Sequence, residues 1–197
     1  PLFHTPYMHA PAAPAPTLPR IHPLQWAIAL SAMLTTFSAQ MGMSTAYAVF
    51  KPLTMALALA CVAIVASSSA RSAGFWLLMS GLCFSMVGDV FLLTDQRFFP
   101  GLIAFLLAHL CYIALFTRDA PWIANKTGLA CCLGAGALVF SYLYRHGLPP
   151  AMQLPVAIYV MVIAVMSAQA IGRAYVLRTS AARCVAWGAL SFMVSDT

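Results

Sequence analysis

The sequence predicts an all-α fold, a polytopic bundle of transmembrane helices, from its composition, its charge and the lengths of its apolar stretches. The chain has 197 residues, of which 62% are hydrophobic and only 7% are charged. Soluble domains carry about 25% charged and about 45–50% apolar residues, so an ordinary soluble domain is excluded. Apolar stretches of about 20 residues, the length that crosses a hydrocarbon core, recur along most of the chain.

The N-terminal segment differs from the rest of the chain. Residues 1–23 hold seven of the thirteen prolines, with alternating Pro and Ala from Pro11 to Pro16, and they show no helical periodicity. This composition predicts a disordered or extended tail. Residues 24–197 then form the transmembrane helical domain.

Seven apolar stretches follow the tail, and each is bounded by a basic residue, Gly or Pro. In chain order we expect helices at 24–47, 52–70, 74–94, 98–117, 127–145, 150–172 and 184–197. The second is short, and Lys51 stands at its outer mouth before Pro52, which suits the first turn of a helix. The seventh breaks off before it can span a bilayer, so we expect a C-terminally incomplete domain with at least one further helix.

The basic residues are scattered singly along the chain, which argues against a nucleic-acid partner despite the net charge of +6. They instead predict orientation, because short cytoplasmic loops are enriched in Lys and Arg. One side holds Arg20, Arg71, Arg118, Lys126, Arg173, Arg178 and Arg183, and the other holds only Lys51, Arg97 and Arg145. This bias predicts a cytoplasmic N-terminus, in the plasma membrane or, for a bacterial protein, the inner membrane.

Two of the four acids lie inside apolar stretches. Asp89 is in the third and Asp196 in the seventh, whereas Asp95 and Asp119 lie at helix ends beside arginines. An ionisable side chain at the centre of a membrane helix costs about 2.5–3.5 kcal/mol on insertion scales, so its presence indicates a function by default. The alternative is that each intramembrane Asp is a structural partner of a Lys, Arg or Tyr on a neighbouring helix.

Three other polar residues belong to different stretches at comparable depths. His109 falls in the fourth stretch, Tyr159 in the sixth, and Lys51 opens the second. Together with Asp89 and Asp196 they could converge on one cavity toward the outer leaflet. Each also has a structural interpretation, in which His109 and Tyr159 are packing residues and Lys51 is a snorkelling anchor.

Five short motifs carrying these polar residues resemble the lysoplasmalogenase family, also called YhhN-like, in the same order. They are Lys51-Pro-Leu-Thr-Met55, Phe84-Ser-Met-Val-Gly-Asp-Val-Phe-Leu-Leu93, Phe105-Leu-Leu-Ala-His-Leu-Cys-Tyr112, Pro155-Val-Ala-Ile-Tyr159 and Gly188-Ala-Leu-Ser-Phe-Met-Val-Ser-Asp196. The resemblance covers roughly residues 45–197. It implies eight membrane helices in the complete protein and hydrolysis of the vinyl ether bond of a lysoplasmalogen to a fatty aldehyde and a glycerophospho head group.

The chemistry of that reaction agrees with the residue types. A vinyl ether is hydrolysed by protonation of its β-carbon, and a second carboxylate can stabilise the resulting cation and accept a proton from water. The resemblance assigns catalysis to Asp89 and Asp196, without deciding which is the acid. We expect His109 and Tyr159 to orient water, and Lys51 to meet the lipid phosphate. Supporting roles are also expected for Ser85 and Ser195, which precede the two acids. No metal and no cofactor is expected.

Other functions are less well matched by the sequence. A serine hydrolase lacks support because no G-x-S-x-G motif occurs, and a metal hydrolase would need more His or acid ligands than the helices offer. The main alternative is a proton- or ion-coupled transporter that uses Asp89, Asp196 and His109 as a relay. The expected partners are a lysophospholipid substrate and membrane lipid, and protein partners are left unassigned.

Overall fold

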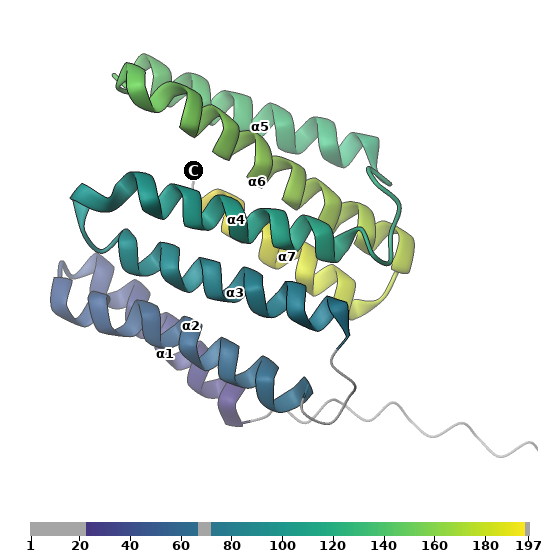
Figure 1. The fold of residues 1–197 in the computed structure, drawn as a ribbon, viewed down its shortest axis with the longest axis horizontal. Helices are drawn as coiled ribbons and strands as arrows, with labels where there is room; N and C mark the ends of the chain where they lie inside the picture. Colours follow the sequence, from purple (N-terminus) through teal and green to yellow (C-terminus); the bar gives the residue numbers. More distant parts are fainter. Residues whose placement is uncertain (1–22, 67–71, 196–197) are drawn as a thin grey trace, which may run out of the picture.

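The computed structural model describes residues 23–66 and 72–195, and this part of the chain is all-helical (Figure 1). Its elements are α1 (Pro23–Gln40), α2 (Ser44–Ala66), α3 (Ala73–Phe91), the short 3₁₀ helix η1 (Asp95–Arg97), α4 (Phe98–Phe116), α5 (Lys126–Arg145), α6 (Pro150–Leu177) and α7 (Ser180–Ser195). The all-α prediction is confirmed. The predicted tail lies outside the described residues, except for Pro23 at the start of α1.

Five of these helices are long and apolar enough to cross a membrane, and they are α2 to α6. This agrees with an integral, multi-pass membrane protein. Neither α1 nor α7 is among the five. The expected total of eight spans is therefore not confirmed by the described residues.

The boundary between the first two helices differs from the prediction. We expected one helix over 24–47 and the next to begin at 52, whereas α1 ends at Gln40 and α2 begins at Ser44. Gly42 explains the break, because its φ of 67° lies in the left-handed region that favours glycine and ends helices. Lys51 therefore lies about two turns inside α2 rather than at its mouth, and Pro52 is an interior proline.

The last two helices also have different limits from those predicted. α6 continues to Leu177 rather than 172 and ends at Arg178, whose φ of 53° is left-handed. α7 begins at Ser180 rather than 184. Hydropathy marks where a helix leaves the apolar layer, whereas the backbone hydrogen bonds continue into the polar region, so the pattern underestimated both helices.

Consecutive helices pack side by side from α1 to α4, and α4 then packs against α6, which also contacts α5 and α7 (Figure 1). α6 is accordingly the central helix, with Ile163 and Ser167 fully buried. The hydroxyl of Ser167 donates a hydrogen bond to the carbonyl of Ala189 on α7 at 3.2 Å. Polar side chains thus join helices where the surrounding core is apolar, as is usual in membrane bundles.

Close packing of α3 on α4 depends on small residues. A Cβ at Gly88 would lie 2.6 Å from the ring of Phe105, and one at Gly81 would overlap the ring of Tyr112. Between them Ser85 forms a hydrogen bond of 3.2 Å with the Tyr112 hydroxyl. This contact holds the end of α3 that carries the first candidate acid against α4.

At the opposite end of the bundle the loop between α4 and α5 is attached to α6. The buried side chain of Gln169 accepts a hydrogen bond from Ile123 N at 3.1 Å and donates one to Pro121 O at 3.0 Å. Arg173 donates two hydrogen bonds to Asp119, at 2.7 and 2.6 Å. These bonds hold the pKa of Asp119 below its usual value, against the opposing effect of desolvation.

Candidate active site

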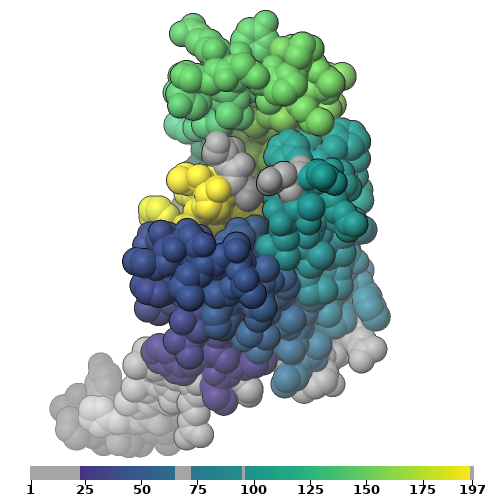
Figure 2. Space-filling view, turned by 90° about the vertical axis from the view of Figure 1, so that its left-hand side faces the viewer, coloured from purple at the N-terminus to yellow at the C-terminus, as the bar shows by residue number. Residues whose placement is uncertain are grey.

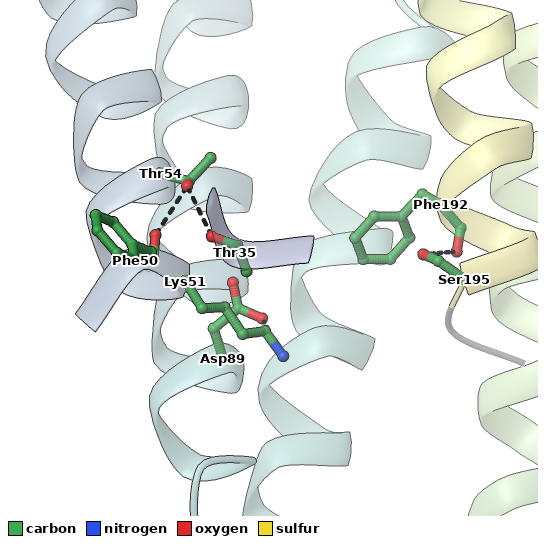
Figure 3. Close-up of polar contacts among 7 residues, drawn as sticks. All are labelled: Thr35, Phe50, Lys51, Thr54, Asp89, Phe192 and Ser195. Atoms are coloured by element: carbon green, nitrogen blue, oxygen red, sulfur yellow. Dashed lines mark hydrogen bonds and ion pairs between the residues drawn. The ribbon is translucent and has the colours of Figure 1, made fainter. Parts of the chain in front are cut away.

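The first candidate acid forms an ion pair between α2 and α3. Asp89, in the last turn of α3, is buried, and its Oδ1 lies 3.2 Å from Nζ of Lys51 on α2 (Figure 3). A carboxylate in low-dielectric surroundings is costly alone, and an adjacent ammonium stabilises its charged form. The structural interpretation of Asp89, as a partner of Lys on a neighbouring helix, thus describes its surroundings correctly. The two charges nevertheless lie inside the bundle, where charges are costly.

Lys51, inside α2, lies beside Tyr47 as well as Asp89. Its Nζ lies 5.4 Å from the centroid of the Tyr47 ring, one turn before it on the same helix. The Lys51 side chain is 23% exposed and that of Asp89 is 11% exposed. The cation is the more accessible partner, so an incoming anion meets it first.

Lys51 of the ion pair lines a cavity of about 420 Å³, and Asp89 lies behind Lys51 without lining the cavity itself. The cavity is lined by Lys51, Leu92, Phe98, Leu102, Phe105, Leu143, Leu148, Val156, Tyr159, Val160 and Ser195. Among these described residues Lys51 alone is charged, and most of the others are hydrocarbon or aromatic. Ligand pockets typically measure about 300–1,000 Å³ and combine an apolar lining with a few polar groups, so this cavity suits an amphiphilic molecule.

Two residues of α7 lie across this space from the ion pair (Figure 3). The ring of Phe192 lies 5.9 Å from that of Phe105 on α4. Ser195 lines the cavity, and its hydroxyl donates to the Phe192 carbonyl at 3.0 Å. The second predicted acid, Asp196, directly follows Ser195 in the sequence and lies outside the described residues.

His109 lies behind the cavity wall and does not line it. Its side chain is fully buried, and the rings of Tyr159 and Phe192 each lie 5.4 Å away in edge-on contact. Neither ring nitrogen has a hydrogen-bond partner among the described residues. Because buried polar groups are normally hydrogen-bonded, His109 has unused hydrogen-bonding capacity next to the wall formed by Tyr159.

The structure brings some of the predicted supporting residues together and leaves others apart. Lys51, Tyr159 and Ser195 line one cavity. Asp89, His109 and Ser85 do not line it, although Asp89 is paired with Lys51 at its edge. Ser85 is instead hydrogen-bonded to Tyr112 on α4, one turn before the acid on α3. The chemical roles assigned to these residues stay predictions.

Sequence reasoning missed the aromatic residues that surround the site. Phe105 is four residues before His109, and Phe192 is three residues before Ser195, so each pair shares a helix face. That spacing was the available signal, but aromatic residues are common on buried helix faces. Phe105 lines the cavity, and Phe192 lies behind it in ring contact with Phe105 and His109.

The chemistry available at the cavity is that of a carboxylate, an ammonium, a phenol and a hydroxyl. These groups can transfer protons, bind an anion and hold water. No group of three or more His, Cys, Asp or Glu side chains that could hold a metal ion occurs within residues 23–66 and 72–195.

The sequence of this chain matches one family model and several named proteins. The YhhN family model matches residues 46–197. The chain is similar to proteins named lysoplasmalogenase TMEM86B: it is 37% identical to that of Rattus norvegicus over 122 residues, which are 61% of this chain and 47% of the relative. Identity to the Mus musculus protein is 35% over 122 residues, 61% of this chain and 48% of the relative. Identity to the Homo sapiens protein is 30% over 148 residues, 75% of this chain and 60% of the relative. The chain thus spans about half the length of the two rodent relatives. No solved structure matches.

Proposed function

Because this chain belongs to the YhhN family, we propose that it hydrolyses the vinyl ether bond of a lysoplasmalogen-type lysophospholipid to a fatty aldehyde and a glycerophospho head group. The observation that carries the proposal is the Lys51–Asp89 ion pair beside an apolar cavity. Relatives named lysoplasmalogenase support the substrate class. The pair combines a carboxylate suited to proton transfer with a cation suited to a lipid phosphate.

The reaction needs one proton donor and one proton acceptor. An acid transfers a proton to the β-carbon of the vinyl ether, which leaves an oxocarbenium ion at the α-carbon. Water adds to that carbon and loses a proton, and the resulting hemiacetal expels the glycerol oxygen as an alcohol while its hydroxyl becomes the aldehyde carbonyl. Two carboxyl groups that exchange protons in this way return to their starting states after one water is consumed.

The ion pair supports a division of these roles. In this scheme Asp89, charged beside Lys51, stabilises the oxocarbenium ion and takes the proton from water. Asp196, carried over from the family motif, is the proton donor. Lys51 also contacts a phosphate oxygen of the lipid, because an ammonium is a flexible point charge that can share itself between two anions.

The remaining residues have supporting roles in the same scheme. Tyr159 and Ser195 line the cavity and hold the attacking water or the glycerol part of the substrate. His109 acts through Tyr159, whose ring it contacts. Ser85 keeps α3 in place through its hydrogen bond to Tyr112.

We place the cavity in the half of the bilayer away from the cytoplasm. It lies at the ends of the helices where Arg97 and Arg145 are found, while the opposite end carries Arg118, Lys126, Arg173, Arg178 and Arg183. Short cytoplasmic loops are enriched in Lys and Arg, so the N-terminus is assigned to the cytoplasm. Arg20 and Arg71, which the sequence adds to the same side, lie outside the described residues.

The direct test measures fatty aldehyde after a lysoplasmalogen is added to the purified protein in lipid nanodiscs. Asp89→Asn is expected to lower aldehyde release at least about 100-fold, as for loss of general acid–base catalysis. Asp119→Asn is the matched control, because it alters the ion pair at the far end of the bundle and should leave activity unchanged. No aldehyde from the wild type, or full activity in Asp89→Asn, would contradict the proposal.

Transport by a proton or ion relay is the rival function, and the same purified protein reconstituted in liposomes tests it. Sealed proteoliposomes report flux under a proton gradient. If the protein released no aldehyde but showed coupled flux that Asp89→Asn abolished, its function would be transport and not hydrolysis. Hydrolysis that persists in the presence of chelators is the expected result for catalysis by carboxylates.

A further inference from the structure

The cavity continues from the ion pair into a crevice between α4 and the hairpin formed by α5 and α6. α5 packs mainly on α6, so the outer ends of α4 and α5 do not close on one another. We define the α4–α6 crevice by the six side chains Phe98, Leu102, Leu143, Leu148, Val156 and Val160. Figure 2 shows the green α5–α6 hairpin at the top of this face and the teal α4 below it and to the right.

The walls of the α4–α6 crevice are apolar along their length. Val156 and Val160 on α6 are buried, with 5% and 6% exposure. At the outer end Phe98 and its neighbour Phe99 are 45% and 44% exposed. In a membrane these exposed rings face lipid. A hydrocarbon chain can therefore pass from the bilayer into the crevice beside the rings without meeting a polar barrier, whereas a charged head group cannot.

The crevice has a closed inner end. Phe105 and Tyr159 are only 3% and 5% exposed, and His109 behind them is fully buried. Along the axis of α4 the distance from Phe98 to Phe105 is about 10 Å at a rise of about 1.5 Å per residue. The enclosed part of the crevice is therefore short and apolar, and a longer chain extends past the exposed Phe98 at its outer end.

The charge distribution selects the kind of ligand that fits. Lys51 is the one cation among the described lining residues, and the α4–α6 crevice is continuous with it in a single cavity. In a lysoplasmalogen the vinyl ether bond joins the glycerophospho part directly to the hydrocarbon chain. When the phosphate is at Lys51 and the reacting bond is at Asp89, the chain must continue toward an apolar wall.

We propose that the α4–α6 crevice binds the hydrocarbon chain of the lipid whose phosphate contacts Lys51, and that Val156 forms the wall of the part of the crevice that only a longer chain reaches. The inference rests on the proposed function for the identity of the lipid. The crevice itself is a property of the cavity and can be tested without hydrolysis. Its occupant is a single chain of a phosphate-bearing lipid.

The first test narrows the crevice and compares two substrates. Val156→Phe adds a ring to a buried wall, and overpacking of this kind corresponds to about a tenfold or greater loss. We expect kcat/KM for an octadecenyl lysoplasmalogen to fall by about that factor while kcat/KM for the octenyl lysoplasmalogen changes little. Leu102→Ala, which widens the opposite wall, is expected to shift the preference toward the long chain.

The matched control is Leu154→Phe on the same helix. Leu154 is 69% exposed and does not line the cavity, so its replacement should leave the ratio of the two kcat/KM values unchanged. Equal loss on both substrates in Val156→Phe would assign Val156 to packing alone and overturn the proposal. If Val156→Phe changed the oligomeric state on size-exclusion chromatography in detergent, the crevice would be assigned to self-association. That result would also overturn the proposal.

A binding measurement separates this inference from the proposed function. Octyl and octadecyl ether lysophosphocholines lack the vinyl double bond and cannot be hydrolysed by this route, and their binding can be followed by the shift they cause in the thermal unfolding midpoint. Val156→Phe should reduce the shift by the octadecyl lipid selectively, and Lys51→Met should reduce the shifts by both lipids. If wild-type protein releases no aldehyde yet shows this pattern, the crevice stands and the reaction fails. If aldehyde is released but chain length has no effect on either readout, the crevice assignment fails alone.

Discussion

Two ion pairs at opposite ends of the molecule differ in ways that bear on function. Asp119 and Arg173 meet through two contacts of 2.7 and 2.6 Å, and the Asp119 side chain is 44% exposed. Asp89 and Lys51 meet at 3.2 Å, and the Asp89 side chain is 11% exposed beside a cavity. A guanidinium fork holds a carboxylate in one geometry, whereas an ammonium can share its charge with a second anion.

The comparison teaches that an ion pair is informative through its surroundings. The Asp119–Arg173 pair fastens a loop to α6, together with the buried Gln169, and borders solvent. The Asp89–Lys51 pair joins two helices at an apolar cavity, where charge is costly and a phosphate-bearing lipid has room. Below, the buried Asp89–Lys51 pair is called the inner pair and the exposed Asp119–Arg173 pair the outer pair, after their exposure and not after the sides of the membrane. Three changes test the distinction between them, from the largest expected effect to the smallest.

Removing one charge of the inner pair should have the largest effect. Lys51→Met leaves the buried Asp89 carboxylate without this cation, and breaking a buried pair in this way costs about 3–5 kcal/mol in the free energy of unfolding. Unfolding in detergent measures the loss. The double variant Lys51→Met, Asp89→Asn should regain most of the stability and remain inactive. If Lys51→Met were as stable as the wild type, the inner pair would contribute no more to the free energy of unfolding than a surface pair.

A methyl group added beside the inner pair should have an intermediate effect. In Gly88→Ala the new Cβ would lie 2.6 Å from the Phe105 ring, so α3 and α4 must move apart, at a cost of about 1–3 kcal/mol. Aldehyde release should fall with stability, because Asp89 follows Gly88. The matched control is Gly134→Ala on α5, where nothing lies within 4 Å of the new Cβ. There the replacement of a helical glycine by alanine should raise the free energy of unfolding by about 0.5–1 kcal/mol. Equal effects at both sites would remove the role given to close packing.

The outer pair should contribute least. Asp119→Asn is expected to cost at most about 1 kcal/mol at neutral pH, because the pair is exposed. The folded-state pKa of Asp119 is lowered, so its stabilisation is present above the unfolded-state pKa of about 4 and is lost as the pH falls through the lower folded-state pKa. The difference in unfolding midpoint between wild type and variant should therefore vanish well below pH 4, and shrink at high salt. A difference that grew on acidification would have the wrong sign for this pair.

Local sequence signals predicted most of the helices and misplaced some of their ends. The apolar pattern located α3, α4 and α5 to within a few residues, but it joined the start of α2 to α1 because Gly42 sits between two apolar segments. That error moved Lys51 from the interior of a helix to its mouth. Helix ends depend on backbone conformation at single residues such as Gly42 and Arg178, and hydropathy averages over them.

The candidate site was only partly accessible to the same reasoning. Asp89, Lys51 and Tyr159 stood out because they are polar residues in apolar surroundings, and they lie at or beside one cavity. The wall residue Phe105 and the ring of Phe192 packed against it were not identified, because an apolar residue on an apolar helix does not differ from its neighbours in polarity. Their place emerges from ring contacts between helices that are distant in the sequence.

By itself the sequence determined that this protein is an all-helical membrane protein with charged residues inside its apolar helices, because the length of an apolar stretch and the position of a charge within it are properties of the sequence alone. The family motif around Asp89 was likewise identified from the sequence alone. Only the tertiary structure decided that Lys51 is the partner of Asp89 and that Lys51 lines an apolar cavity between α4 and the α5–α6 hairpin. Such pairing depends on the rotation of each helix, and that rotation is set by contacts such as Gly88 against Phe105, which join residues on different helices.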